Sequence, residues 1–76
     1  MEIATFIKNF ANILDDTDPS VVTEDKAFRD IEEWSSLTAL SLIAMVDEEY
    51  SIKFTGDDIK TSVTIKDLFE KVKSKL

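Results

Sequence analysis

Hydrophobic residues at the start of the chain recur at intervals of three and four. The residues that carry this pattern are Ile3, Phe6, Ile7, Phe10, Ile13 and Leu14. Such spacing places them on one face of a helix, so we predict an amphipathic helix over residues 2–14. The following segment, Asp15-Asp16-Thr17-Asp18-Pro19, ends that helix. Carboxylates are unfavourable at a helix C-terminus, and the residue before a proline avoids helical dihedral angles.

Residues 16–35 show no sustained hydrophobic period and predict a long polar loop. We expect four apolar residues to anchor this loop to the core: Val21, Val22, Phe28 and Ile31. Loops of this length are uncommon in small domains and usually have a function.

Residues 36–50 predict a second helix that has two apolar faces, with Ser35 as its N-cap. One face is a core stripe made by Ala39, Leu42, Ile43, Val46 and Tyr50. The opposite face groups Leu37, Leu40 and Ala44 with Ser36, Ser41, Asp47 and Glu48. One helix of a small bundle cannot easily bury both faces, so we expect the second to be partly exposed. It is then either a docking surface or a surface that the long loop covers.

The rest of the chain predicts two more helical segments. Residues 51–56 leave the second helix, with Ile52 and Phe54 turned inward, and residues 57–61 form a short helical turn. Residues 63–72 predict a last helix, in which Thr64 and Asp67 have the spacing of a capping box. We therefore expect a single all-α domain over residues 1–76. It is a small antiparallel bundle of three main helices and one short helix, with a long loop between the first two main helices.

Charge is distributed unevenly along the chain and narrows the choice of partners. The net charge is −7; residues 1–50 hold twelve acidic against three basic residues, and residues 51–76 hold four against six. The acidic excess would repel nucleic acid and favours basic partner proteins. The sequence shows neither a signal peptide nor an apolar span long enough to cross a membrane. We therefore expect a soluble, cytoplasmic monomer that does not insert into membranes.

Few residues of the chain are suited to catalysis. It has no cysteine and no histidine, and so lacks the usual thiol nucleophile and the usual general base. The acids show no metal-binding spacing, since Pro19 follows Asp16 and Asp18 closely, and there is no glycine-rich phosphate loop. We therefore expect no enzyme activity and no metal. Ser36, however, stands at a helix start, where free N–H groups and the helix dipole favour an anion such as a phosphodiester.

The order and spacing of these elements resemble an acyl carrier protein of the phosphopantetheine-binding family. The likeness covers essentially the whole chain and is tightest from Ile31 to Phe54, IEEWSSLTALSLIAMVDEEYSIKF. The family's Asp-Ser-Leu falls on Ser35-Ser36-Leu37, which implies that Ser36 is the attachment serine. The segment TIKDLFEKV is similar to the family's last helix. The resemblance also implies that partner enzymes contact the second helix at Leu37, Leu40, Ser41, Ala44, Asp47 and Glu48.

The resemblance implies a cofactor and partners as well. A phosphopantetheinyl transferase would attach 4′-phosphopantetheine from coenzyme A to Ser36, and the thiol of that arm would hold an acyl group as a thioester. Enzymes that load and transfer acyl groups, with basic docking patches, would then visit the carrier. The long loop would brace the serine. Two positions depart from the family pattern, because Ser35 replaces the expected Asp and Ser41 stands where many relatives carry an acid.

The function implied is a carrier in fatty-acid synthesis or in specialised acyl or polyketide-type biosynthesis. Trp34 and Ser35 favour the specialised pathway. Two alternatives stay open at this point. One is an aminoacyl or peptidyl carrier, which the strong acidity disfavours, and the other is an unmodified helical module that only docks to proteins.

Overall fold

Four α-helices make up the fold of residues 2–76, which the computed structural model describes. In chain order they are α1 (Ile3–Asn12), α2 (Ser36–Tyr50), α3 (Gly56–Lys60) and α4 (Ile65–Ser74). Two 3-10 helices, η1 (Pro19–Val21) and η2 (Phe28–Asp30), lie in the crossover between α1 and α2. No strand occurs within these residues, and one isolated antiparallel bridge joins Ala27 to Thr64. The expected all-α bundle is therefore confirmed, while Met1 lies outside the described part of the single domain expected over 1–76.

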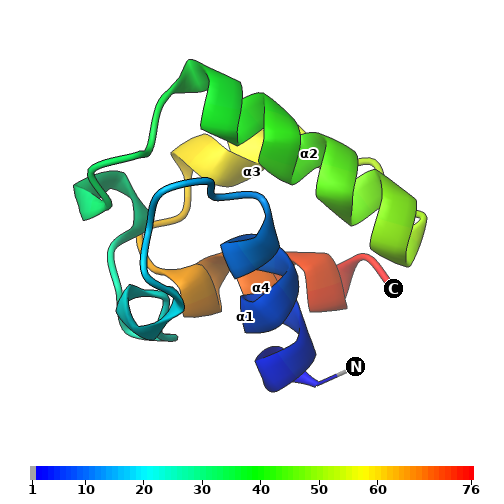
Figure 1. Ribbon diagram of the computed structural model, residues 1–76. Coiled ribbons are helices and arrows are strands. Elements are labelled where there is room, and N and C mark those ends of the chain that lie inside the picture. The colour runs from blue at the N-terminus through cyan, green and yellow to red at the C-terminus, as the bar shows by residue number, and fades with distance from the viewer. Residues whose placement is uncertain (1) are drawn as a thin grey trace.

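The helices surround one hydrophobic core. In Figure 1, α2 lies above α1 and α4, and both chain ends lie on the same side of the molecule. Helix α1 packs against α2 and α4, and α3 packs against the same two helices. Core side chains come from every α-helix and from the crossover; those with no exposed surface are Phe6, Phe10, Phe28, Leu42, Val46, Ile65, Leu68 and Val72.

The ends of α1 and α4 differ from the predicted ones by one or two residues. The N–H of Ile13 donates to the carbonyl of Phe10 at 3.1 Å, so the chain tightens into a 3-10 turn and α1 ends at Asn12. Helix α4 begins at Ile65 and not at Val63, because Thr64 is extended and caps it. The predicted capping box is confirmed, with the Asp67 carboxylate accepting from the N–H of Thr64 at 3.0 Å.

The buried face of α2 is centred on Leu42 and Val46, as predicted, but it also includes Met45, which the predicted stripe left out. The other predicted stripe residues, Ala39, Ile43 and Tyr50, are partly buried and pack against the core. Helix α2 ends at Tyr50 and is capped by Ser51, which has a left-handed backbone with φ of 55°. Its N–H donates to the carbonyl of Asp47 at 2.9 Å. This turn directs Ile52 and Phe54 into the core, as expected.

Three of the four predicted anchors of the long loop are buried, namely Val22, Phe28 and Ile31. Val21 was expected among them, but it is 38% exposed because it belongs to the surface 3-10 helix η1. The loop is also hydrogen-bonded to the start of α4. Its carbonyls at Lys26 and Glu24 accept from the N–H groups of Ile65 and Lys66, both at 3.0 Å. These bonds satisfy donors that the first turn of a helix leaves without an intrahelical partner.

Arg29 joins the loop to the end of α3. Its guanidinium donates to the carbonyls of Ser62 at 2.6 Å and Ile59 at 2.8 Å, and it lies over the Phe28 ring. A cation at a helix C-terminus is favoured by the helix dipole. The crossover is thus hydrogen-bonded both to the start of α4 and to the end of α3. These two attachments position the segment that leads into α2.

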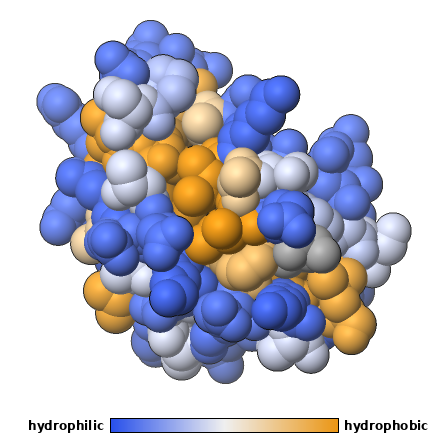
Figure 2. Space-filling view, turned by 90° about the horizontal axis from the view of Figure 1, so that it is seen from below, coloured by the Kyte–Doolittle hydropathy of each residue, from blue (hydrophilic) through white to orange (hydrophobic). Residues whose placement is uncertain are grey.

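The side of the molecule opposite α2 is not fully covered by polar groups. Figure 2 shows an apolar strip on this lower side, bordered by hydrophilic side chains. Several apolar side chains from α1 and its end are only partly buried, namely Ile3, Ile7, Ala11 and Ile13. No helix of residues 2–76 has the length and apolar character needed to span a bilayer.

Candidate functional site

The start of α2 is held by a small group of hydroxyl contacts. Ser35 is extended, and its Oγ accepts a hydrogen bond from the N–H of Thr38 at 3.4 Å, so the expected N-cap is confirmed. Thr38, which is only 8% exposed, donates its own hydroxyl to the carbonyl of Glu33 at 2.9 Å. Sequence reasoning missed this role of Thr38, because a threonine three residues after a cap carries no distinctive signal.

Ser36 is the first residue of α2, and its side chain is exposed. Within residues 2–76, the N–H groups of Ser36 and Leu37 have no protein acceptor. Free N–H groups and the positive end of the helix dipole suit a phosphate attached at this position. An exposed hydroxyl beside free N–H groups therefore suits the attachment of a phosphate-bearing group.

Trp34 anchors the segment that precedes Ser36. Its ring lies parallel to that of Phe10, with 6.3 Å between the ring centroids and 4° between the planes. The Trp34 and Phe28 rings pack edge to face, with 4.8 Å between the ring centroids and 65° between the planes. Aromatic pairs of this geometry contribute about 0.5–1.5 kcal/mol each beyond the area that they bury. Trp34 therefore ties the candidate serine to α1 and to η2 together.

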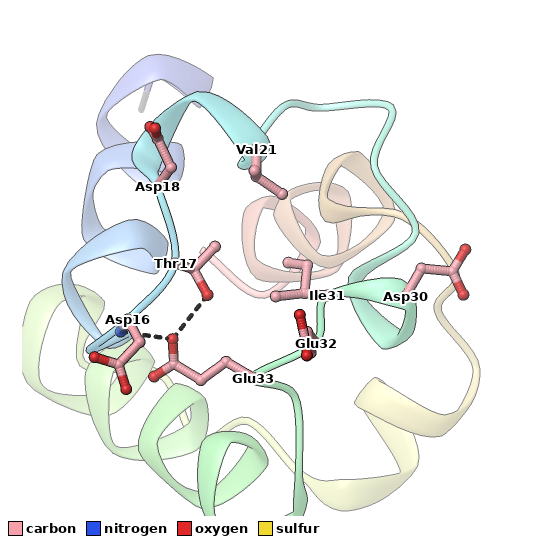
Figure 3. Close-up of a pocket in the computed structure, with 8 residues that line it drawn as sticks. All are labelled: Asp16, Thr17, Asp18, Val21, Asp30, Ile31, Glu32 and Glu33. Atoms are coloured by element: carbon pink, nitrogen blue, oxygen red, sulfur yellow. Dashed lines mark hydrogen bonds between the residues drawn. The ribbon is translucent and has the colours of Figure 1, made fainter.

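Glu33 forms a second brace, which sequence reasoning missed. Its carboxylate accepts from the N–H groups of Asp15 at 2.5 Å and Asp16 at 2.9 Å, and from the Thr17 hydroxyl at 2.7 Å. The Asp16 and Thr17 bonds are drawn in Figure 3. These bonds from Asp15, Thr17 and Asp16 hold the pKa of Glu33 below its ordinary value. The Glu33 side chain thus links the residues that follow α1 to the residues just before α2.

An acidic cleft of about 620 Å³ lies in the crossover, beside the Glu33 brace. Figure 3 shows its lining residues, Asp16, Thr17, Asp18, Val21, Asp30, Ile31, Glu32 and Glu33. No group of three or more acids within the described residues has the arrangement to hold a metal ion. The cleft therefore adds negative charge near the start of α2.

The second apolar stripe of α2 is exposed, as expected, and the long loop does not cover it. Leu37 is 76% exposed and Leu40 is 62% exposed. The remaining residues expected on this face are exposed as well: Ser36, Ser41, Ala44, Asp47 and Glu48. We name the set Leu37, Leu40, Ser41, Ala44, Asp47 and Glu48 the α2 face. It combines apolar side chains with carboxylates, the composition of a surface able to receive an apolar and basic partner.

Comparison with known proteins agrees with this geometry. The family described as "Phosphopantetheine attachment site" matches residues 4–72, which is nearly the whole chain. No curated protein and no solved structure matches it. Proteins of this family are carriers without catalytic activity of their own, and they bear a 4′-phosphopantetheine group that a phosphopantetheinyl transferase attaches. An exposed serine at a helix start fits such a group, whose thiol supplies the point at which cargo is held. With the family matched over this length, and with a four-helix fold that presents such a serine, the chain belongs to the phosphopantetheine-binding carrier proteins.

Proposed function

We propose that this protein is an acyl carrier whose phosphopantetheine arm is attached to Ser36. Its cargo is an acyl group held as a thioester, for fatty-acid synthesis or for a specialised acyl or polyketide-type pathway. The observation that carries the proposal is the exposed hydroxyl of Ser36 in the first turn of α2, next to two free N–H groups. Ser35, the neighbouring hydroxyl, caps the helix through the N–H of Thr38 and is less suited to modification.

The charge of the chain bears on the enzymes that would visit this carrier. The chain carries a net charge of −7, and Asp47 and Glu48 lie exposed at the far end of the α2 face. A partner that binds this surface needs basic side chains around an apolar contact. We therefore expect the transferase and the acyl-handling enzymes to approach through basic patches.

Mass spectrometry tests the attachment site. After incubation with coenzyme A, magnesium and a broad-specificity phosphopantetheinyl transferase, the wild-type chain gains the mass of one phosphopantetheine. The Ser36→Ala variant gains none, while Ser35→Ala still gains one. Labelling that depends on Ser35 and not on Ser36 would move the site by one residue. A wild-type chain that no transferase labels would overturn the carrier proposal and favour an unmodified docking module.

The identity of the cargo is tested on the modified protein. The holo form, purified from cells that express it, is digested, and the thioester-bound group on the Ser36 peptide is identified by mass. A fatty-acyl or ketoacyl group supports the proposal. An aminoacyl or peptidyl group refutes the acyl assignment while leaving the carrier function in place.

The role of the acidic residues of the α2 face is tested by charge reversal. The double variant Asp47→Lys with Glu48→Lys should lower the transferase association rate about tenfold at low salt, since electrostatic steering governs encounter. Glu24→Lys with Asp25→Lys is the matched control, because these exposed acids lie in the crossover beside α4. Equal rates for the two double variants would refute docking through the α2 face.

A further inference from the structure

A second cleft, of about 350 Å³, opens beside α2 and the segment that follows it. It is lined by Leu40, Ile43, Ala44, Asp47, Lys53 and Phe54. Three of these residues belong to the α2 face, Ile43 and Phe54 were expected to face the core, and no feature of the sequence had marked Lys53. The volume lies near the lower limit of about 300 Å³ for small-molecule pockets. That size suits one bulky side chain of a partner.

The walls of this cleft are mostly apolar. Phe54 is only 2% exposed, whereas Leu40 stands 62% exposed at the surface. Ile43 is partly buried and packs against the core. An inserted apolar side chain would therefore lose water on contact with a preformed apolar wall, which is the arrangement of an interface hot spot.

Two opposite charges flank this apolar wall. Asp47 and Lys53 are both exposed. The ion pair of the described residues joins Lys75 to Asp58 at 3.0 Å, and neither Asp47 nor Lys53 takes part in one. Both charges are thus available to a partner. The cationic Lys53 stands out, because the other charged residue of the cleft and those of the α2 face are all acidic.

We propose that this cleft receives one bulky apolar side chain of a partner protein that is flanked by a basic and an acidic residue, and that Lys53 selects the acidic one. The basic residue faces Asp47 and the acidic residue faces Lys53. The basic patch expected of a partner would therefore contain one acidic residue opposite Lys53, because a basic residue there would place like charges together and discriminate against a uniformly basic patch. This inference rests on the proposed carrier function, which makes the α2 face a surface that other proteins visit.

The test uses two helical peptides as probes and the Ser36→Ala chain, so that no arm is present. Each peptide carries one Phe with an Arg one turn before it; one peptide has Glu one turn after the Phe, and the other has Arg there. Binding is followed by NMR titration of the isotope-labelled chain at about 0.01 M salt, where charges act over about 30 Å. We expect the mixed-charge peptide to bind about fivefold more tightly, with shifts at Leu40, Ile43 and Phe54.

Variants of Lys53 decide whether this residue is the selector. Lys53→Glu should reverse the preference toward the all-basic peptide, and Lys53→Gln should remove most of it. Lys60→Glu is the matched control, since it makes the same charge change at an exposed position on α3 outside the cleft, and it should keep the wild-type preference. The proposal is overturned if the all-basic peptide binds the starting chain equally well, or if Lys53→Glu leaves the preference unchanged. Absence of shifts at the cleft with both peptides also overturns it.

Failure of this inference can be told apart from failure of the carrier function. Peptide discrimination is measured without the arm, whereas the carrier function is read from labelling of Ser36. A chain that is labelled but shows no discrimination loses only the role assigned to Lys53. A chain that discriminates but is never labelled keeps this docking cleft and loses the carrier function.

Discussion

Replacing Trp34 with alanine tests whether the segment before Ser36 is held by aromatic packing. Trp34 is partly buried and contacts the rings of Phe10 and Phe28. Most of Trp34 is buried, and the loss of about 100 Å² of buried apolar surface, at about 25 cal/mol per Å², costs about 2.5 kcal/mol. Full truncation of a buried tryptophan costs about 3–5 kcal/mol. We therefore expect Trp34→Ala to lower the free energy of unfolding by about 2–3 kcal/mol.

A loss of this size is large for a small chain. At about 0.05–0.15 kcal/mol per residue, a chain of this length has a total stability of about 4–11 kcal/mol. The variant should therefore still fold, with a Tm lower by roughly 10–20 °C. Unfolding is followed by far-UV circular dichroism in urea and on heating, because the substitution removes the chain's single tryptophan and with it the fluorescence probe.

Leu37→Ala is the matched control for this experiment. Leu37 is also a large apolar residue close to Ser36, but it is 76% exposed, so its truncation should change stability by less than about 0.5 kcal/mol. Trp34→Phe keeps a ring in the site and should cost less than Trp34→Ala. The reasoning fails if Trp34→Ala is no more destabilising than Leu37→Ala. At a temperature where both variants are folded, Trp34→Ala should also label more slowly at Ser36.

Three further substitutions test the local contacts. The folded pKa of Glu33 lies below its ordinary value of 4.5, so its hydrogen bonds stabilise the fold above pH 4.5, and this contribution is lost as the pH falls toward the folded pKa. Glu33→Gln should therefore flatten the fall of Tm between pH 7 and acid, and identical acid profiles would contradict the brace. Ser51→Gly should raise the free energy of unfolding by about 0.5–1 kcal/mol in urea titrations, because Ser51 has a φ of 55° that glycine adopts without strain. A gain with Ser51→Ala as well would show that the backbone conformation is not the cause. Ser35→Asp should keep the cap, add about 0.3–1 kcal/mol through the helix dipole, and speed labelling by a broad-specificity transferase. Unchanged labelling kinetics would show that the missing carboxylate does not limit recognition.

Local signals accounted for the positions of the helices. The spacing of Phe6 and Phe10, the Ser35 cap and the box of Thr64 with Asp67 all act within a few residues of one another. Periodicity and capping depend on short-range geometry, so they can be read from sequence. The exposure of Leu37 and Leu40 could also be predicted, because a helix turns only one face toward a single core and the opposite face stays outside.

Contacts between distant segments could not be read in this way. Glu33 closes onto Asp15 and Asp16, and Arg29 reaches the carbonyls of Ile59 and Ser62. Both side chains are polar residues in a stretch without periodicity, which gives no sign of their partners. The prediction that Val21 is buried was wrong for a related reason. Only the path of the crossover determines which of two adjacent valines faces the core, and the local sequence does not reveal that path.

By itself, the sequence determined the helices, the exposed α2 face and a serine at a helix start, because these depend on local spacing and capping. Tertiary structure decided how Ser36 is held and where Lys53 stands. Trp34 and Glu33 brace the serine only because the crossover brings Phe10, Phe28 and the residues after α1 next to them. Lys53 meets Asp47 at one cleft only because the chain turns back at Ser51 after α2. Such contacts follow from long-range packing, which places residues together without any mark in the local sequence.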